Sequence, residues 1–134
     1  ALCNAAKAGV DVRIITPHIP DKPLVFELTR SHYEPLLEAG VQIFEYTPGF
    51  VHAKNMVADD LCAVVGSINL DYRSMFLHFE DAVLLYRDPT ILDVKRDFLE
   101  TQFKSQPVTL EECLAHAWPR RLFRSILRVL APLL

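Results

Sequence analysis

Glycine is scarce in this sequence, and long uncharged apolar runs are absent. Only four of the 134 residues are glycine, 51% are hydrophobic and 23% are charged, a balance that excludes a disordered, collagen-like or low-complexity chain. No run of roughly 18 uncharged apolar residues occurs, and residues 1–14 hold neither a long apolar stretch nor a cleavage site. The sequence therefore predicts neither a membrane span nor a signal peptide. We expect one globular module or a piece of a larger protein.

Cysteine is also scarce, and its spacing fits no metal site. The three cysteines are Cys3, Cys62 and Cys113. Their number is odd and no CxxC pair occurs, which favours reduced thiols that act as small hydrophobic residues over a disulfide framework or a zinc site. Three histidines likewise lack ligand spacing, so we expect structural or solvent-exposed roles for them. These are His18, His32 and His116.

Positive charge is unevenly distributed along the chain. The net charge is -3, but residues 118–134 hold four arginines and no acid, which leaves residues 1–117 with ten basic and seventeen acidic groups. An acidic body repels a nucleic-acid backbone. We therefore expect no nucleic-acid partner, although a local basic pocket would escape this argument.

The C-terminal segment has the pattern of a basic amphipathic helix. Within residues 118–130 the apolar side chains fall on one helical face and the arginines largely on the other. The apolar residues are Leu122, Phe123, Ile126, Leu127 and Leu130. Such a helix suits a membrane surface of anionic lipid headgroups. The alternative is a helix that packs its apolar face on its own domain.

Helix and strand patterns alternate in the first third of the chain. Residues 1–8 have helical composition, end at Gly9 and lack a capping signal, which indicates that the helix begins upstream. Strand patterns at 10–15 and 41–46 flank a helical stretch from about residue 24 to residue 39, so we expect a βαβ unit. Inside that stretch, Ser31 and Glu34 form a candidate capping box.

The middle of the chain predicts further strands. Residues 50–57 and 61–66 read as two strands joined at Asp59-Asp60, a good hairpin candidate. A short helix or turn is expected at 70–75 and a third strand at 79–86.

The last elements are predicted to be helical. Asp88 and Pro89 are typical of a helix start, and the helix that follows carries an apolar face expected to cover the sheet. That face holds Ile91, Leu92, Phe98, Leu99 and Phe103. Thr109 and Glu112 form a second capping box for a helix that Pro119 ends or kinks, after which 120–130 resume the helical period. The whole pattern predicts an α/β fold with a mixed sheet covered by helices.

The spacing HxKxxxxD is the strongest chemical signal. It is formed by His52, Lys54 and Asp59. Chance predicts about 0.01 such matches in a chain of this composition. If residues 51–57 are a strand, His52 and Lys54 share a face about 6–7 Å apart and can both reach one phosphate. The alternative is a half-exposed strand with a solvated lysine and a hydrogen-bonded histidine.

A second polar cluster follows at Gly66-Ser67-Ile68-Asn69. Ser67 and Asn69 stand where an apolar strand ends and a short helix begins, a place where hydroxyl, amide and backbone N–H donors converge on an anion. They are also ordinary N-cap residues, so a capping role stays open. Glu80 follows among apolar residues and needs a partner if it faces inward, for which a nearby histidine is one candidate.

Together these residues resemble the phospholipase D superfamily, whose signature HxKxxxxD is followed by GSxN and then by a glutamate. The runs EAGVQIFEYTPGFVHAKNMVADD and GSINLDYRS, and the terminal VTLEE and LAPLL, look like the C-terminal half of bacterial cardiolipin synthases of this type. The resemblance implies an α-β-α sandwich with a mixed sheet. It also implies a catalytic lobe over residues 1–106 and a basic helical tail over residues 107–134.

The resemblance also implies roles for the site residues. His52 would be the phosphoryl-accepting nucleophile or its partner acid. Lys54 and Asn69, supported by Ser67, would bind the nonbridging phosphate oxygens. Glu80 would orient His52 through a hydrogen bond to its ring, and Asp59 would have a structural or supporting role. The scheme requires no metal or other cofactor.

The implied reaction transfers a phosphatidyl group between two phosphatidylglycerol molecules, releases glycerol and passes through a phosphohistidine. Family enzymes use two such motifs and this chain has one, so a second lobe is expected from a missing N-terminal half or from a homodimer mate. The parent protein is expected at the cytoplasmic side of a bacterial cell membrane. Two other functions stay open: a homodimeric single-motif nuclease or phosphodiesterase, and a noncatalytic fragment that binds lipid surfaces.

One departure from the family pattern lies next to Glu80. His78 stands where cardiolipin synthases typically have asparagine. It is either a further proton donor at the rim of the site or a surface residue.

Overall fold

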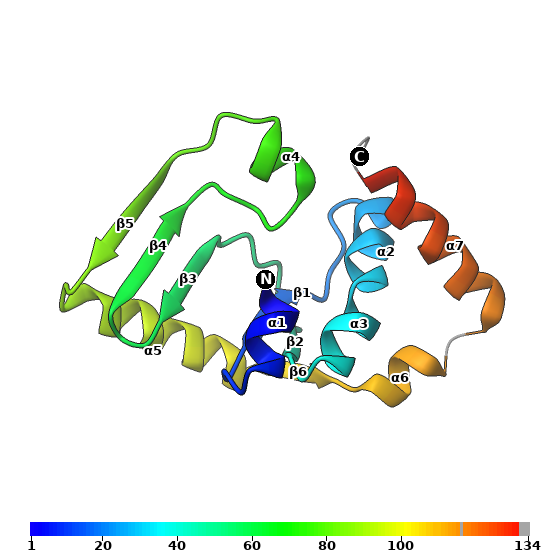
Figure 1. Cartoon of the computed structure of the whole chain (residues 1–134), viewed down its shortest axis with the longest axis horizontal. Coiled ribbons are helices and arrows are strands. Elements are labelled where there is room, and N and C mark those ends of the chain that lie inside the picture. The colour runs from blue at the N-terminus through cyan, green and yellow to red at the C-terminus, as the bar shows by residue number, and fades with distance from the viewer. Residues whose placement is uncertain (116, 132–134) are drawn as a thin grey trace. The chain divides into compact units, whose positions relative to one another are not determined.

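The computed structural model describes residues 1–115 and 117–131, so the expectation for His116 lies outside the described residues (Figure 1). The chain forms two compact units. Unit 1 comprises Ala1–Phe50 and Lys104–Leu134, and unit 2 comprises Val51–Phe103. The division between residues 106 and 107 that the resemblance implies stays a prediction.

Unit 1 contains a mixed three-stranded sheet with the order β1-β2-β6. Its elements are α1 (Leu2–Lys7), β1 (Arg13–Pro17), α2 (Pro23–Ser31), α3 (Tyr33–Glu38), β2 (Gln42–Tyr46), β6 (Ser105–Val108), α6 (Leu110–Leu114) and α7 (Trp118–Leu130). β1 and β2 are parallel and joined through α2 and α3, which confirms the predicted βαβ unit. β6 pairs antiparallel with β2. The predicted mixed sheet is therefore confirmed.

The core of unit 1 follows from the alternation along β2. Val41, Ile43 and Glu45 share one face of the strand and are all buried, at 2%, 2% and 5% exposure. Tyr33 from α3 and Cys113 from α6 complete the buried cluster. Cys113 thus has the expected role of a small hydrophobic residue.

The two capping boxes predicted for unit 1 have different outcomes. The box of Thr109 and Glu112 is confirmed at the start of α6. The box of Ser31 and Glu34 is wrong: His32 is the N-cap of α3, and the Ser31 hydroxyl instead donates to the carbonyl of Leu28 at 2.6 Å, within the preceding helix.

Pro119 has a different position from the one expected. α6 already ends at Leu114, and Pro119 lies in the first turn of α7, where its missing N–H breaks no helical hydrogen bond.

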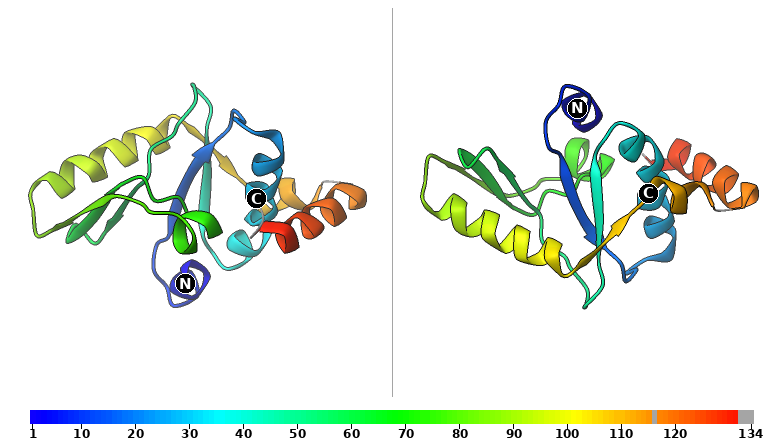
Figure 2. Two further views of the ribbon diagram at one scale, coloured as in Figure 1. Left: turned by 90° about the horizontal axis from the view of Figure 1, so that it is seen from above. Right: turned by 90° about the horizontal axis from the view of Figure 1, so that it is seen from below.

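Unit 2 is an antiparallel sheet with the order β3-β4-β5 and one long helix along it (Figures 1 and 2). Its elements are β3 (Asn55–Ala58), β4 (Cys62–Gly66), α4 (Tyr72–Phe76), β5 (Ala82–Tyr86) and α5 (Thr90–Phe103). The hairpin between β3 and β4 is confirmed. Asp59 and Asp60 both have positive φ, 52° and 55°, and the Leu61 N–H donates to the Ala58 carbonyl at 3.0 Å, which closes the turn between the strands.

α5 packs on the sheet through less of its surface than predicted. Ile91 is fully buried, and Ala63 of β4 is fully buried as well. Leu92 and Phe103 are 54% and 92% exposed, so the prediction that the whole apolar face covers the sheet is wrong. A three-stranded sheet offers too narrow a surface for a helix of 14 residues.

The strands of unit 2 are shorter than their sequence patterns. β3 begins at Asn55 and β5 begins at Ala82. His52, Lys54 and Glu80 therefore lie in the segments that lead into these strands, and the expectation that a strand places His52 and Lys54 on one face is wrong.

Candidate active site

The register of the unit 2 sheet brings most of the predicted residues to one end. Asn55 pairs with Val65, and Gly66 pairs with Ala82. The start of β3, the end of β4 and the start of β5 consequently lie together, at the end of the sheet where Figure 1 shows α4. The segments that contain His52, Lys54, Ser67, Asn69 and Glu80 leave or enter the sheet at this end.

Asp59 is the predicted residue that lies elsewhere. It follows β3, whereas Lys54 precedes it, so the strand separates the two by roughly 16 Å along the chain. Asp59 occupies the hairpin turn, where aspartate tolerates a left-handed backbone. A structural role in the turn is consistent with this place, and the role itself stays a prediction.

Gly66 allows β4 and β5 to approach closely just before Ser67. A Cβ atom added at Gly66 would meet the Asp81 carbonyl oxygen and lie 2.6 Å from Ala82 Cα, closer than real Cβ contacts come. Glycine is therefore required at this position by the packing of the neighbouring strand.

Ser67 is held against the segment before β5 and binds Glu80. Its backbone N–H donates to the Asp81 carbonyl at 2.9 Å, and its hydroxyl accepts from the Asp81 N–H at 3.0 Å. The hydroxyl donates to Glu80 Oε2 at 2.5 Å. The N-cap of α4 is Asp71, which accepts from the Ser74 N–H at 2.7 Å. The open alternative that Ser67 or Asn69 caps this helix is therefore wrong.

His78 joins the same cluster from the loop between α4 and β5. Arg73 Nε donates to His78 Nε2 at 3.2 Å, which makes Nε2 an acceptor and places the ring proton of a neutral imidazole on Nδ1. That Nδ1 lies 3.7 Å from Glu80 Oε1. The two oxygens of Glu80 thus face Ser67 and His78, and its predicted contact with His52 stays a prediction.

Lys54 presents a cation to this cluster. Its Nζ donates to the His52 backbone carbonyl at 2.8 Å, which ties the lysine to the histidine segment. Partial burial lowers the pKa of Lys54, while the negative charges of Glu80 and Asp71 oppose that shift. The lysine therefore lies within electrostatic reach of the glutamate.

The carboxylate of Glu80 is stabilised in its charged form. The hydrogen bond from Ser67 is the largest cause that lowers its pKa, followed by one from Ser74, and the charge of Lys54 adds a smaller contribution. The arrangement combines an anionic acceptor, a cation and two imidazoles at one end of a sheet. Such a set can bind a phosphate and move protons.

Sequence reasoning did not assign Arg73 and Ser74 their contacts with His78 and Glu80. The signal available was the position of these residues directly after the GSIN run, in a helix of only five residues. Among the described residues, no group of three or more histidine, cysteine, aspartate or glutamate side chains is placed to hold a metal ion. In the same described part of the chain, none of the helices is both long and apolar enough to cross a bilayer.

Comparisons with known proteins agree with the motif. The family described as "Cardiolipin synthase, PLD-like domain" matches residues 1–102. An uncharacterized protein of Streptococcus mutans is 48% identical over all 134 residues, which cover 29% of its length. A cardiolipin synthase of Halalkalibacterium halodurans is 41% identical over the whole chain, which covers 27% of that protein. The chain therefore spans less than a third of the length of these relatives.

A solved structure has the same fold. The crystal structure of Nuc from Salmonella typhimurium, a phospholipase D family member, superposes with a TM-score of 0.66 at 16% identity, covering 80% of this chain and 70% of that one. The likeness confirms the α/β fold with a mixed sheet that the resemblance implied.

Proposed function

Because the chain belongs to the family of cardiolipin synthase, PLD-like domains, we propose that it supplies one half of the active site of a phospholipase D-type phosphatidyltransferase. The parent enzyme makes cardiolipin from two phosphatidylglycerol molecules. The observation that carries the proposal is the convergence of the HxK, GSxN and glutamate segments at one end of the unit 2 sheet.

The first step is attack by a neutral His52 ring nitrogen on phosphorus. The nitrogen–phosphorus bond forms, the phosphorus–oxygen bond to glycerol breaks, and the leaving alkoxide takes a proton from a second histidine. In the second step the hydroxyl of another phosphatidylglycerol attacks phosphorus and gives its proton to that second histidine. The nitrogen–phosphorus bond breaks and His52 is regenerated. No metal or other cofactor enters the scheme.

Lys54 and Asn69 are assigned to the nonbridging phosphate oxygens. Charge grows on these oxygens as the pentavalent state forms, so a lysine cation close to them stabilises the transition state more than the substrate. Ser67 supports the group by holding Glu80, and Glu80 fixes the tautomer of His52.

The second histidine comes from a second motif-bearing lobe, either the missing N-terminal half of the parent or another copy of this chain. Unit 2 offers extensive apolar surface for such a lobe. Phe79 is fully exposed, Val83 and Leu84 of the edge strand β5 are 61% and 67% exposed, and Phe76 is 72% exposed. Exposed apolar groups in this number are typical of an interaction surface.

The direct test measures cardiolipin and glycerol formed from phosphatidylglycerol vesicles by the parent enzyme. We expect His52→Ala to lower the rate by about 10²-fold or more. His32→Ala in unit 1 is the matched control and leaves the rate within about twofold of the wild type. Full activity of the His52 variant would reject the phosphohistidine mechanism.

A separate assay tests the alternative of a homodimeric nuclease. The chain is incubated with duplex and single-stranded DNA in the presence of chelator, and its mass in solution is measured. We expect no cleavage, since residues 1–117 are acidic. Cleavage that requires His52 would favour the nuclease.

Membrane contact is assigned to the outer face of α7. Leu122, Ile126 and Val129 lie on this face and are 53%, 52% and 78% exposed, whereas Leu127 is buried. The helix thus packs partly on its own unit and still presents an apolar stripe, which suits the surface of an anionic membrane at its cytoplasmic side.

A flotation assay with phosphatidylglycerol vesicles tests this assignment. We expect the double variant Leu122→Glu, Ile126→Glu to lose vesicle binding. The matched control, Leu92→Glu with Leu99→Glu, adds the same charge on the exposed face of α5 and keeps it. If both double variants bind vesicles equally well, α7 is not the membrane contact and the tail does not anchor the chain.

A further inference from the structure

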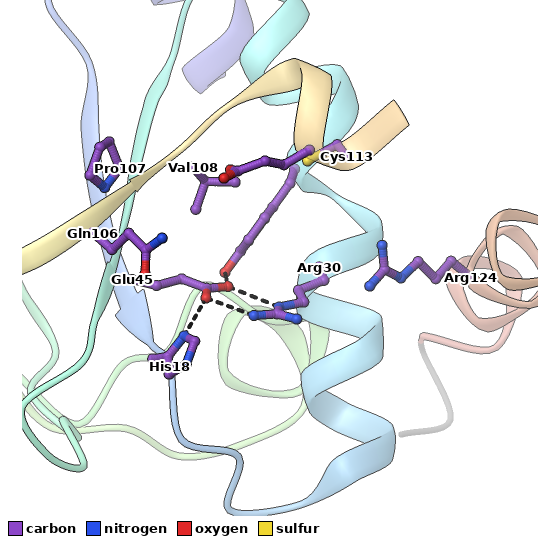
Figure 3. Close-up of a pocket in the computed structure, with 10 residues that line it drawn as sticks. His18, Arg30, Glu45, Gln106, Pro107, Val108, Cys113 and Arg124 are labelled. Atoms are coloured by element: carbon purple, nitrogen blue, oxygen red, sulfur yellow. Dashed lines mark hydrogen bonds and ion pairs between the residues drawn. The ribbon is translucent and has the colours of Figure 1, made fainter. Parts of the chain in front are cut away.

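Unit 1 contains a cavity of about 180 Å³, which is much larger than a void that holds a single water molecule (Figure 3). It is lined by residues from α2, α3, β2, β6, α6 and α7 and from the segment after β1. The polar lining consists of His18, Arg30, Tyr33, Glu45, Gln106, Glu112 and Arg124. All of them belong to unit 1, so the cavity is independent of the catalytic proposal.

Glu45 lines the cavity, and each of its two carboxylate oxygens has two hydrogen-bond partners. Arg30 donates to both of its oxygens, through Nε at 2.9 Å and Nη2 at 2.7 Å. His18 Nδ1 bonds Oε2 at 2.8 Å, and the Tyr33 hydroxyl donates to Oε1 at 3.1 Å. Burial raises the pKa of Glu45, but the hydrogen bonds from Arg30 and His18 lower it by more, so the group stays charged.

The side chain of Arg124, in contrast, is buried with only part of its hydrogen-bonding capacity used. Its side chain is 8% exposed, and its Nε donates to Glu27 at 2.8 Å. Its Nη2 is buried, and among the residues that the structure describes it has no hydrogen-bond partner. Figure 3 shows the Arg124 guanidinium extending from α7 toward α2, the helix that carries Arg30. A buried cationic donor without an acceptor is costly, which indicates that an acceptor belongs beside it.

The charges around the cavity favour an anionic acceptor. Arg30 pairs with Glu45 inside the cavity. Arg124 has to share the single carboxylate of Glu27 with Arg120, which lies outside the lining, so the Arg124 guanidinium is only partly neutralised. Glu112 is at the exposed mouth, where its carboxylate accepts from the Thr109 N–H at 2.9 Å. Solvent screens that charge more than the buried ones.

We propose that this cavity binds a small oxyanion, a phosphate group, through Arg124 Nη2. The oxygens of the ligand accept from the free Nη2 of Arg124, while the ion pair of Arg30 with Glu45 remains intact. Guanidinium groups bind phosphate oxygens with short, charge-assisted hydrogen bonds. The ligand is either inorganic phosphate or the phosphate of a glycerol headgroup.

Calorimetric titration of the 134-residue chain with inorganic phosphate and with sn-glycerol 3-phosphate tests the proposal. Arg124→Lys keeps a cation that can pair with Glu27 and removes Nη2, so we expect its affinity to fall about tenfold. Arg120→Gln removes a whole positive charge that also pairs with Glu27 but does not line the cavity. We expect its affinity to change by less than about twofold.

The pair of variants distinguishes a specific site from general attraction, because the control loses more charge than the test variant. Tighter binding of glycerol 3-phosphate identifies a headgroup, and equal binding identifies the free ion. No heat of binding up to high millimolar ligand would overturn the proposal, as would a loss in Arg120→Gln equal to that in Arg124→Lys. Amide exchange on α7 reports whether each variant remains folded, and a variant that has lost this protection is replaced by Arg124→Gln.

Discussion

At the scale of single residues, Gly66 matters for both the fold and the candidate site, because β4 ends at this residue and Ser67 follows it. The close approach of Ala82 leaves no room for a side chain at Gly66. A change at this position therefore acts on strand pairing and on the hydrogen bond between Ser67 and Glu80 together.

We predict that Gly66→Ala destabilises the chain by about 1–3 kcal/mol, since the added methyl group must push β5 away from β4. The free energy of unfolding in urea measures the effect. Gly49→Ala is the control, because nothing lies within 4 Å of a Cβ at that position. Equal stability of the two variants would contradict the tight approach.

Glu45 is the most deeply buried acid in unit 1, and Arg30 is its principal partner. We predict that Arg30→Met costs about 3–5 kcal/mol, because it leaves a buried carboxylate with only His18 and Tyr33. The double variant Arg30→Met, Glu45→Leu should recover most of that loss. Urea unfolding at neutral pH measures both. A double variant as unstable as the single one would show that packing, and not charge, dominates the effect.

Single residues also show how far the site could be predicted. The motif spacing identified Ser67 and Glu80, which the structure places in contact. The same spacing includes Asp59, which the structure places at the other end of the sheet, because a linear motif carries no information on strand ends. The sequence does not decide whether His78 is a proton donor at the rim of the site or a surface residue, because its contacts with Arg73 and Glu80 depend on the loop between α4 and β5.

At the scale of elements, Glu27 links α2 to α7, because it accepts from both Arg120 and Arg124. The hydrogen bond from Arg120 is the largest cause that lowers the pKa of Glu27, from its ordinary value of 4.5 to about 2. The folded chain therefore binds fewer protons at this group than the unfolded chain. The attachment stabilises the chain above about pH 4.5 and is lost as the pH falls toward 2.

We predict that amide exchange in α7 accelerates between about pH 4.5 and 2, after correction for the intrinsic rate. Glu27→Gln should show the fast exchange already at neutral pH and no further acceleration in that window. Glu100→Gln, an exposed glutamate on α5, is the control and should behave as the wild type. Unchanged protection in Glu27→Gln would show that apolar contacts alone hold α7.

Local sequence signals had different outcomes. The capping box of Ser31 and Glu34 is wrong, because Ser31 still belongs to α2. The box at Thr109 and the turn at Asp59-Asp60 are encoded within four residues, and both are confirmed. β6 was not predicted, because Ser105–Val108 contains a proline and becomes a strand only through pairing with β2, far away in the sequence. The exposed face of α5 likewise depends on the width of a sheet that the helix sequence does not describe.

At the scale of the whole molecule, the chain holds one HxKxxxxD motif, whereas the proposed reaction uses two histidines. If the second lobe is another copy, each dimer needs two intact His52 residues. We predict that an equal mixture of wild-type chain and His52→Ala chain has about a quarter of the activity of the same total amount of wild type, after exchange to statistical pairing. A mixture with half the activity would show that each chain acts alone. Activity only with the N-terminal lobe of the parent would identify that lobe as the partner.

Unit 1 is built from two stretches of sequence that flank all of unit 2. During synthesis, the residues of unit 2 leave the ribosome before β6 exists, so β2 waits with one edge unpaired while the catalytic segment is already complete. An open strand edge is a template for wrong pairing. The order of translation therefore completes unit 2 before the sheet of unit 1, and in that interval the open edge of β2 is the strand exposed to wrong pairing.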